Sequence, residues 1–118
     1  MNRELQIDQP ALVSAWKAQM PSFLEDGDSF AVQADETDPH SLRIHINAAG
    51  HQAYSFDFRC TYVDSREVAV DLVDVERAGR SADERTDVVQ ELARDYTRHI
   101  HECAQNLQRI TNVKEAGR

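Results

Sequence analysis

The sequence predicts an α+β fold in one domain over residues 1–118. An N-terminal helix, a four-stranded antiparallel β-meander and a long C-terminal helix follow one another, with the long helix packed on one face of the sheet. Three patterns predict this order: an apolar stripe of helical period, then four alternating runs with short polar turns, then a longer helical stripe. Because these turns are shorter than the crossover that parallel strands require, we expect an antiparallel sheet with one buried face.

The first helix is expected over residues 8–20. Asp8 can accept hydrogen bonds from the free N–H groups of the first turn, and Pro10 stands where a missing donor costs nothing. Pro21 then ends the helix at Met20. Apolar residues recur every fourth position along it: Leu12, Trp16 and Met20. This stripe is expected to face the core.

Strands are expected over four runs in which apolar and polar residues alternate: 30–34, 42–47, 54–62 and 68–72. The central hairpin can be aligned so that apolar residues face each other and Arg43 lies opposite Asp57. That register gives three apolar pairs: Ile46 with Tyr54, Ile44 with Phe56, and Leu42 with Phe58. In the last strand Val73 falls out of phase with Leu72, which indicates a β-bulge or the end of the strand.

The C-terminal helix has the clearest signals. Ser81 and Glu84 have the spacing of a capping box. Apolar residues then fall within a stripe about 80° wide: Val89, Leu92, Tyr96, Ile100, Cys103, Leu107 and Ile110. This stripe is about 32 Å long, whereas strands of seven or eight residues span only ~23–26 Å. The helix therefore crosses the sheet diagonally, or its far end is covered by a second copy of the chain or by Trp16 and the first helix.

Composition excludes several functions. The formal net charge of −8 disfavours a phosphate backbone as partner, so no nucleic acid is expected. No signal peptide follows the N-terminal charges, and no apolar run approaches the ~18 residues that span a membrane. The chain is expected in a reducing cytoplasm, where a disulfide between Cys60 and Cys103 would be unusual. It lacks a glycine-rich phosphate loop and the HExxH and CxxC motifs, so no cofactor is expected.

One flank of the C-terminal helix carries a candidate metal site. Asp95, His99 and Glu102 share this flank, where they can supply metal ligands or an oriented imidazole with a base. The alternative is a polar shoulder with surface ion pairs such as Asp95–Arg98, which we favour because the spacing matches no zinc motif. His99 also lies four residues from Cys103, but that thiol falls inside the apolar stripe, where a thiolate is poorly solvated.

The outward-facing residues of the sheet form a candidate interaction face: Arg43, His45, Asp57, Arg59 and Asp71. We favour a solvated, charge-paired surface as the interpretation of this face, and the alternative is a broad docking surface for a protein. A further hypothesis places an apolar ligand between sheet and helix. Five aromatic residues would line such a pocket, although they are more typical of plain core: Tyr54, Phe56, Phe58, Tyr62 and Tyr96.

In size, acidity and order of elements the chain is similar to the small acidic α/β chaperones of bacterial secretion systems. The resemblance implies a dimer that binds protein. It departs from that family at Val63-Asp64-Ser65, where those chaperones usually carry a helix and this chain has no room for one. We therefore expect a non-enzymatic protein-binding or regulatory homodimer. The alternative is a small ligand- or metal-binding protein, or a minimal enzyme, that uses the helix flank.

Overall fold

The computed structural model describes residues 5, 7–48 and 54–111. It confirms the α+β class and the order of elements, with five strands where the sequence predicted four. The elements are α1 (Gln9–Gln19), a short 3₁₀ helix η1 (Met20–Phe23), β1 (Ser29–Ala34), β2 (Ser41–Asn47), β3 (Tyr54–Tyr62), β4 (Val68–Arg77), β5 (Arg80–Ser81), α2 (Asp87–Asn106) and α3 (Gln108–Thr111).

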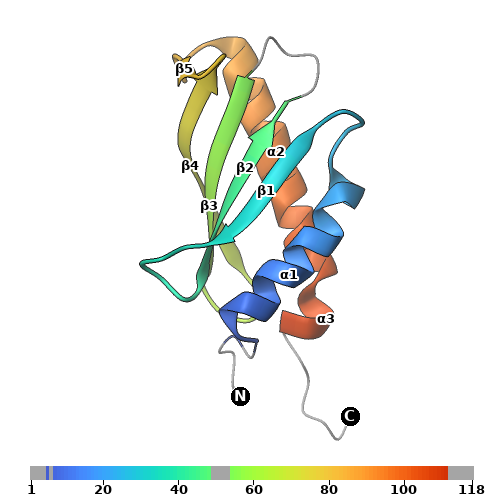
Figure 1. Ribbon diagram of the computed structural model, residues 1–118. Coiled ribbons are helices and arrows are strands. Elements are labelled where there is room, and N and C mark those ends of the chain that lie inside the picture. The colour runs from blue at the N-terminus through green and yellow to red at the C-terminus, as the bar shows by residue number, and fades with distance from the viewer. Residues whose placement is uncertain (1–4, 6, 49–53, 112–118) are drawn as a thin grey trace, which may run out of the picture.

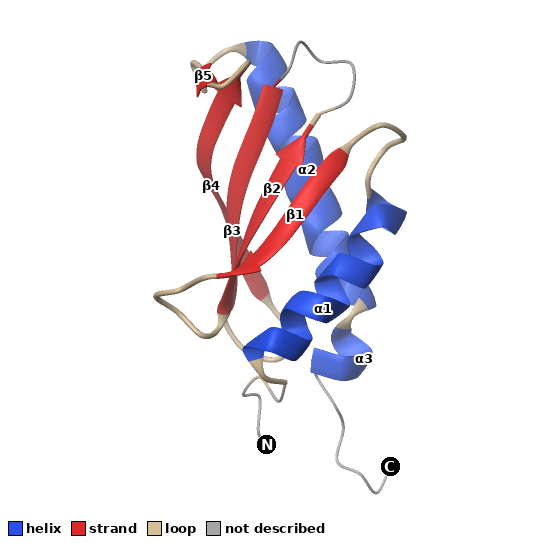
Figure 2. Cartoon of the chain, viewed as in Figure 1, coloured by secondary structure: helices blue, strands red, loops and turns tan. Residues whose placement is uncertain are grey.

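The strands form one antiparallel sheet in the order β1-β2-β3-β4-β5. Helix α2 runs along one face of this sheet, and α1 lies beside it, against β1 (Figures 1 and 2). The core fills the space between these two layers. It contains the predicted apolar stripe of α1, because Leu12, Trp16 and Met20 are all fully buried.

Helix α1 begins as predicted. The Asp8 side chain accepts a hydrogen bond from the backbone N–H of Ala11 at 3.0 Å, which satisfies one of the free donors of the first turn. The α-helix ends at Gln19, and Pro21 lies in the 3₁₀ turn that follows. This turn leads the chain back to the sheet.

The register of the central hairpin differs from the prediction by two residues. Ile46 lies opposite Phe56, not Tyr54, and His45 instead of Arg43 lies opposite Asp57. The other two apolar pairs shift likewise, to Ile44 with Phe58 and Leu42 with Cys60. A slip of two residues keeps every side chain on the same face, so the alternation that predicts the strands leaves this register open.

The predicted irregularity in the last strand is a β-bulge. The register of β4 against β3 shifts between Asp57 and Phe58, so that Val73 is the additional residue. The strand continues beyond the bulge as far as Arg77, and Val75 is fully buried. The bulge therefore returns the strand to the core after the change of phase that the sequence shows.

The predicted capping box is wrong. Ser81 belongs to the short strand β5, where it lies opposite Glu76 of β4. The helix begins six residues later, at Asp87, with Thr86 as its N-cap. The turn before it is held by Asp83, whose carboxylate accepts a hydrogen bond from the backbone N–H of Arg85 at 2.9 Å.

The far end of the long helix is covered within the chain. The helix breaks at Leu107, and the short helix α3 follows it. Leu107 is 3% exposed and Thr111 is fully buried. The Thr111 hydroxyl donates to the carbonyl of Ser65 in the β3–β4 turn at 3.1 Å. The surplus length of the helix thus needs no second copy of the chain to cover it.

Candidate functional site

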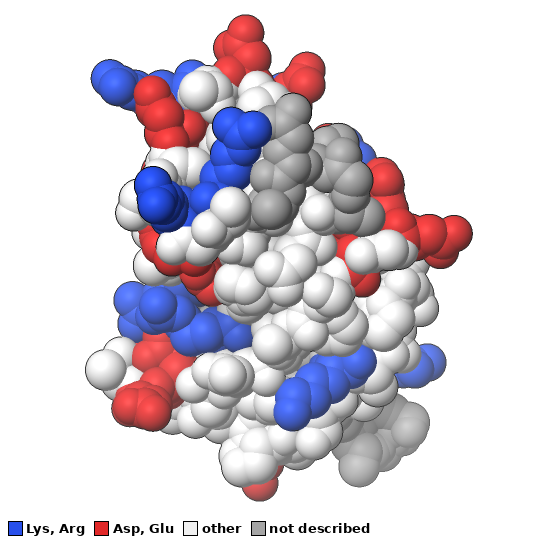
Figure 3. Space-filling view, turned by 45° about the horizontal axis from the view of Figure 1, so that its top comes forward, with Lys and Arg blue, Asp and Glu red and all other residues white. Residues whose placement is uncertain are grey.

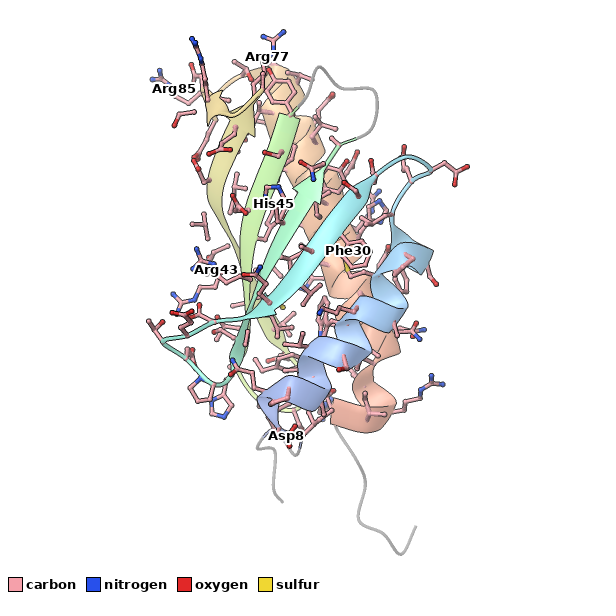
Figure 4. All side chains as sticks on the ribbon, viewed as in Figure 1. Asp8, Phe30, Arg43, His45, Arg77 and Arg85 are labelled. Atoms are coloured by element: carbon pink, nitrogen blue, oxygen red, sulfur yellow. The ribbon has the colours of Figure 1, made fainter. Side chains whose placement is uncertain are left out.

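The predicted interaction face is the outer face of the sheet, on the side away from α2. Antiparallel strands place alternate residues on opposite faces, and the five predicted residues all fall on the outer one: Arg43, His45, Asp57, Arg59 and Asp71. Figure 4 shows Arg43 and His45 on β2 on this side of the sheet. Sequence alternation therefore placed these residues on one face correctly, although it paired them in the wrong register.

A histidine–carboxylate pair lies in the middle of the face. His45 Nδ1 lies 2.7 Å from Asp57 Oδ1, and both side chains are more than one third exposed. This contact fixes the orientation of the imidazole and leaves Nε2 as the ring nitrogen without a hydrogen bond among the described residues. The surface beside the pair is a depression of about 310 Å³ that also includes Ala31, Gln33 and Arg43.

Two arginines that lie opposite each other are held by one buried carboxylate. Arg43 and Arg59 are cross-strand partners, an arrangement that like charges disfavour. Asp35, at the end of β1, lies between them, with its Oδ2 3.1 Å from Arg59 Nε and 3.7 Å from Arg43 Nη1. The Arg59 contact is an ion pair without hydrogen-bond geometry. The Asp35 side chain is only 4% exposed, so this acid lies under the two arginines.

The β1–β2 turn keeps Asp35 ionised. The Thr37 hydroxyl and backbone N–H both donate to Asp35 Oδ1, at 2.7 and 2.8 Å. These hydrogen bonds lower the pKa of Asp35, with smaller contributions from Arg59 and Arg43. Asp35 was not predicted from the sequence as part of this face. The signal was present, because Asp followed two residues later by Thr is the spacing of a side-chain-capped turn.

The outer surface mixes both signs of charge. Figure 3 shows Lys and Arg side chains next to Asp and Glu side chains along one side of the molecule, beside a broad area that carries none of the four. Asp71 of β4 lies directly across from Arg59 of β3. Salt bridges within the face thus neutralise part of its charge locally, although the whole chain carries −8.

The candidate metal flank of α2 is only partly assembled. His99 Nδ1 lies 3.1 Å from Glu102 Oε1, but Asp95 pairs with Arg98 at 3.4 Å. The Asp95–Arg98 ion pair is the one that the alternative interpretation expected. Among the residues that the structure describes, no three His, Cys, Asp or Glu side chains are grouped to hold a metal ion.

Both cysteines are core residues. Cys60 and Cys103 are free thiols with no exposed surface. Burial raises the pKa of both, that of Cys103 to about 12, and the nearby Cys103 contributes to the rise at Cys60. At neutral pH both groups are therefore thiols, the form that does not act as a nucleophile.

The inward aromatic residues fill the interior. All five predicted side chains are at most 9% exposed: Tyr54, Phe56, Phe58, Tyr62 and Tyr96. The ring centroid of Phe56 lies 5.4 Å from that of Tyr96 and 6.3 Å from that of Phe58, which are distances of direct ring contact. Tyr54, Phe56, Phe58 and Tyr96 thus form a chain of ring contacts, and all five side chains belong to the core.

A second depression lies away from the outer face, between the start of β4 and the end of α2. It has a volume of about 470 Å³, and its lining includes Val68, His101, Gln105 and Gln108. At this depression, Gln108 Nε2 donates a hydrogen bond to the backbone carbonyl of Arg66 at 3.0 Å. The sequence gives no local signal for this depression, because it forms between segments about 40 residues apart.

Within the described residues, no helix is both long enough and apolar enough to cross a bilayer. Comparison with protein-family models, with curated protein sequences and with solved structures gives no match to this chain.

Proposed function

We propose that this chain is a small, acidic, non-enzymatic protein-binding or regulatory protein that acts as a homodimer in the cytoplasm. Its outer sheet face would contact the partner protein. The observation that carries this proposal is that helices α1 and α2 both pack away from this face (Figure 2). The charged side chains of the face are held in place by one another.

Pre-organisation supports a binding role for the face. The Asp35 carboxylate fixes Arg43 and Arg59, and Asp57 fixes His45, so these side chains lose little freedom when a partner binds. A face that presents both signs of charge at fixed positions favours a partner with the complementary pattern. The acidic chain as a whole disfavours nucleic acid as that partner.

Site-specific photo-crosslinking in the cells that express the chain tests the docking face. A photoreactive residue at Gln33, which is exposed on β1, should give a discrete adduct with one partner protein. The same residue at Arg94, which is exposed on α2, should not. An adduct of equal yield from both positions would overturn the proposal.

A matched pair of double variants separates the face from general surface charge. The substitutions His45→Ala and Asp57→Ala together remove one hydrogen-bonded pair from the outer face, and we expect the adduct at position 33 to be lost. Asp95→Ala with Arg98→Ala removes a comparable pair from α2, and should leave the adduct intact. Survival of the adduct in the first double variant would contradict the assignment.

Metal or small-ligand binding, or a minimal enzyme, at the α2 flank is the second candidate function. It is supported by the His99–Glu102 contact and by the low exposure of the His99 side chain, 19%. Elemental analysis of protein purified without chelator tests it, together with thermal shifts in zinc, manganese or nickel. A bound metal that is lost on His99→Ala would place this function first, and the absence of both signals would remove it.

A further inference from the structure

Strand β4 presents an open edge. Strand β5 pairs only with the last two residues of β4, Glu76 and Arg77, through a tight hairpin. Among the described residues, no strand pairs with β4 on this side between Val68 and Asp74. At the opposite edge of the sheet, α1 packs against β1 (Figure 1).

The hydrogen-bonding groups of this edge belong to alternate residues. The backbone N–H of Val63 donates to Glu67 at 2.9 Å, whereas that of Tyr62 points the other way and donates to His40 at 2.8 Å. Because antiparallel ladders alternate in this manner, the residues of β4 that bond to β3 are the odd-numbered ones before the bulge. The N–H and C=O groups of Val68, Val70 and Leu72 therefore point away from the sheet.

The same three residues carry apolar side chains that the helix layer does not fully cover. Val68, Val70 and Leu72 point toward the α2 side of the sheet but stay partly exposed. Their neighbours on β3, such as Phe58 and Cys60, are fully buried on that side. The edge thus offers free backbone groups and half-covered apolar side chains at the same positions.

We infer that a second copy of this chain pairs antiparallel with β4, about a two-fold axis at Val70, to form one continuous sheet. This inference rests on the homodimer of the proposed function and assigns its interface. Val70 of one copy would lie opposite Val70 of the other, and Val68 opposite Leu72. All of these residues direct their backbone groups outward, so they form the hydrogen-bonded pairs of the new ladder.

Charge excludes the two neighbouring registers, and the bulge at Val73 disfavours an axis at Leu72. With the axis at Val70, Ala69 of each copy lies opposite Asp71 of the other, and no carboxylate faces a carboxylate. An axis at Asp71 would oppose the two Asp71 side chains directly, and an axis at Ala69 would oppose Glu67 with Asp71. Like charges directly opposite each other destabilise a strand pair. The bulge at Val73 then ends the pairing, because it breaks the regular ladder.

A disulfide trap tests the register. In the inferred dimer the two Val70 Cα atoms lie about 5.5 Å apart, within the range that a disulfide spans. Val70→Cys should therefore give a covalent dimer under mild oxidation. The matched control is Val73→Cys, which is exposed on the same strand but would lie roughly 20 Å from its counterpart. Both native thiols are buried and do not compete.

Light scattering after size-exclusion chromatography measures the oligomeric state of the wild type and of a proline variant. We expect wild type at twice the chain mass of 13.4 kDa, and Val70→Pro as a monomer with unchanged circular dichroism, since the lost N–H points out of the sheet. A monomeric wild type would overturn this interface and the proposed homodimer. Partner binding at the outer face is tested separately, by the photo-crosslinking described above. A dimer that Val73→Cys traps and Val70→Cys does not would overturn this interface alone.

Discussion

Two buried side-chain hydrogen bonds join parts of the chain that are distant in sequence. Trp16 Nε1 donates to the Tyr62 hydroxyl at 3.1 Å and so connects α1 to β3. Thr111 Oγ1 donates to the Ser65 carbonyl and connects α3 to the turn after β3. Both bonds lie where water is excluded, and burial raises the pKa of Tyr62. A donor left without a partner there costs far more than one at the surface.

Tyr62→Phe is therefore expected to destabilise the protein. It leaves the indole N–H of Trp16 buried without an acceptor, and we expect the free energy of unfolding to fall by about 1–3 kcal/mol. Trp16 is the single tryptophan, so its fluorescence during urea unfolding reports the change. The control is Tyr54→Phe, because the Tyr54 hydroxyl has no hydrogen bond among the described residues. An equal loss in both variants would show that the Trp16–Tyr62 bond contributes nothing specific.

Asp35 makes stability depend on pH. Its pKa is lowered in the folded protein, chiefly by the Thr37 hydrogen bonds, so its contribution is present above the unfolded pKa of about 3.9 and is lost as pH falls through the folded value. Asp35→Asn should be less stable than wild type at pH 7, and the difference should shrink below about pH 4. Urea midpoints at pH 7, 5 and 3 measure it. Asp26→Asn, at an exposed carboxylate away from both proposed interfaces, is the control, and a difference that stays constant with pH would contradict this role of Asp35.

The outer face shows how far single residues can be predicted from the sequence. Alternation alone placed Arg43, His45 and Asp57 on one surface, because the side-chain period of a strand is fixed by its geometry. It did not identify the partner of each residue, since a slip of two leaves the pattern unchanged. Asp35 was missed because its role depends on how the β1–β2 turn folds toward Arg59, a contact between two strands that are not neighbours.

Among the elements, the β4–β5 hairpin has the most demanding backbone. Its two central residues, Ala78 and Gly79, both have positive φ angles, 52° and 82°. This is the geometry of a two-residue turn that matches the twist of the strands. Glycine adopts it without strain, whereas alanine in the left-handed region costs roughly 1–2 kcal/mol. Ala78 is therefore a source of backbone strain in this turn.

Opposite substitutions in this turn should have opposite effects. Ala78→Gly removes the strain and should raise the free energy of unfolding by up to about 1 kcal/mol. Gly79→Ala adds strain and should lower it by about 1 kcal/mol, since a Cβ there meets no atom within 4 Å and only the backbone is affected. Thermal unfolding of both variants beside wild type measures the two shifts. Shifts of the same sign would contradict the turn geometry.

Elements with local signals were predicted well. Asp8, Pro10 and Pro21 marked the limits of α1, and the alternating runs marked four strands. The sequence around Ser81 was misread because its spacing fits a capping box while its place is decided by pairing with Glu76. The helix break at Leu107 was missed for a similar reason, since the last turn is fixed by its contact with another part of the chain.

At the scale of the whole molecule, the meander leaves its two edges in different surroundings. Helix α1 packs beside β1, while β5 protects only the end of β4. Acidic side chains at Glu67, Asp71 and Asp74 line the open part of β4, and charges at an edge commonly prevent unwanted pairing. Registers about Ala69 or Asp71 would place carboxylates opposite each other, whereas the register about Val70 keeps them apart. The charges of this edge therefore exclude two of the possible registers and are compatible with the register about Val70.

The net charge also sets how self-association responds to salt. Two copies that each carry −8 repel each other, and this repulsion is screened as the Debye length falls from about 30 Å at 0.01 M to about 8 Å at 0.15 M salt. Raising sodium chloride over this range should therefore lower the dimer dissociation constant, by about tenfold if screening removes 1.4 kcal/mol of repulsion. Sedimentation equilibrium at both salt concentrations measures it.

Asp71→Asn is the informative variant for this dependence. It removes the carboxylate next to the inferred axis from both copies, so its dimer should be tighter at low salt and respond less to added salt. Asp95→Asn, which removes the same charge from α2, should keep a response closer to that of wild type. A dimer that weakens as salt is added would mean that opposite charges meet at the interface. It would point away from the acidic edge of β4 and toward the mixed charges of the outer face.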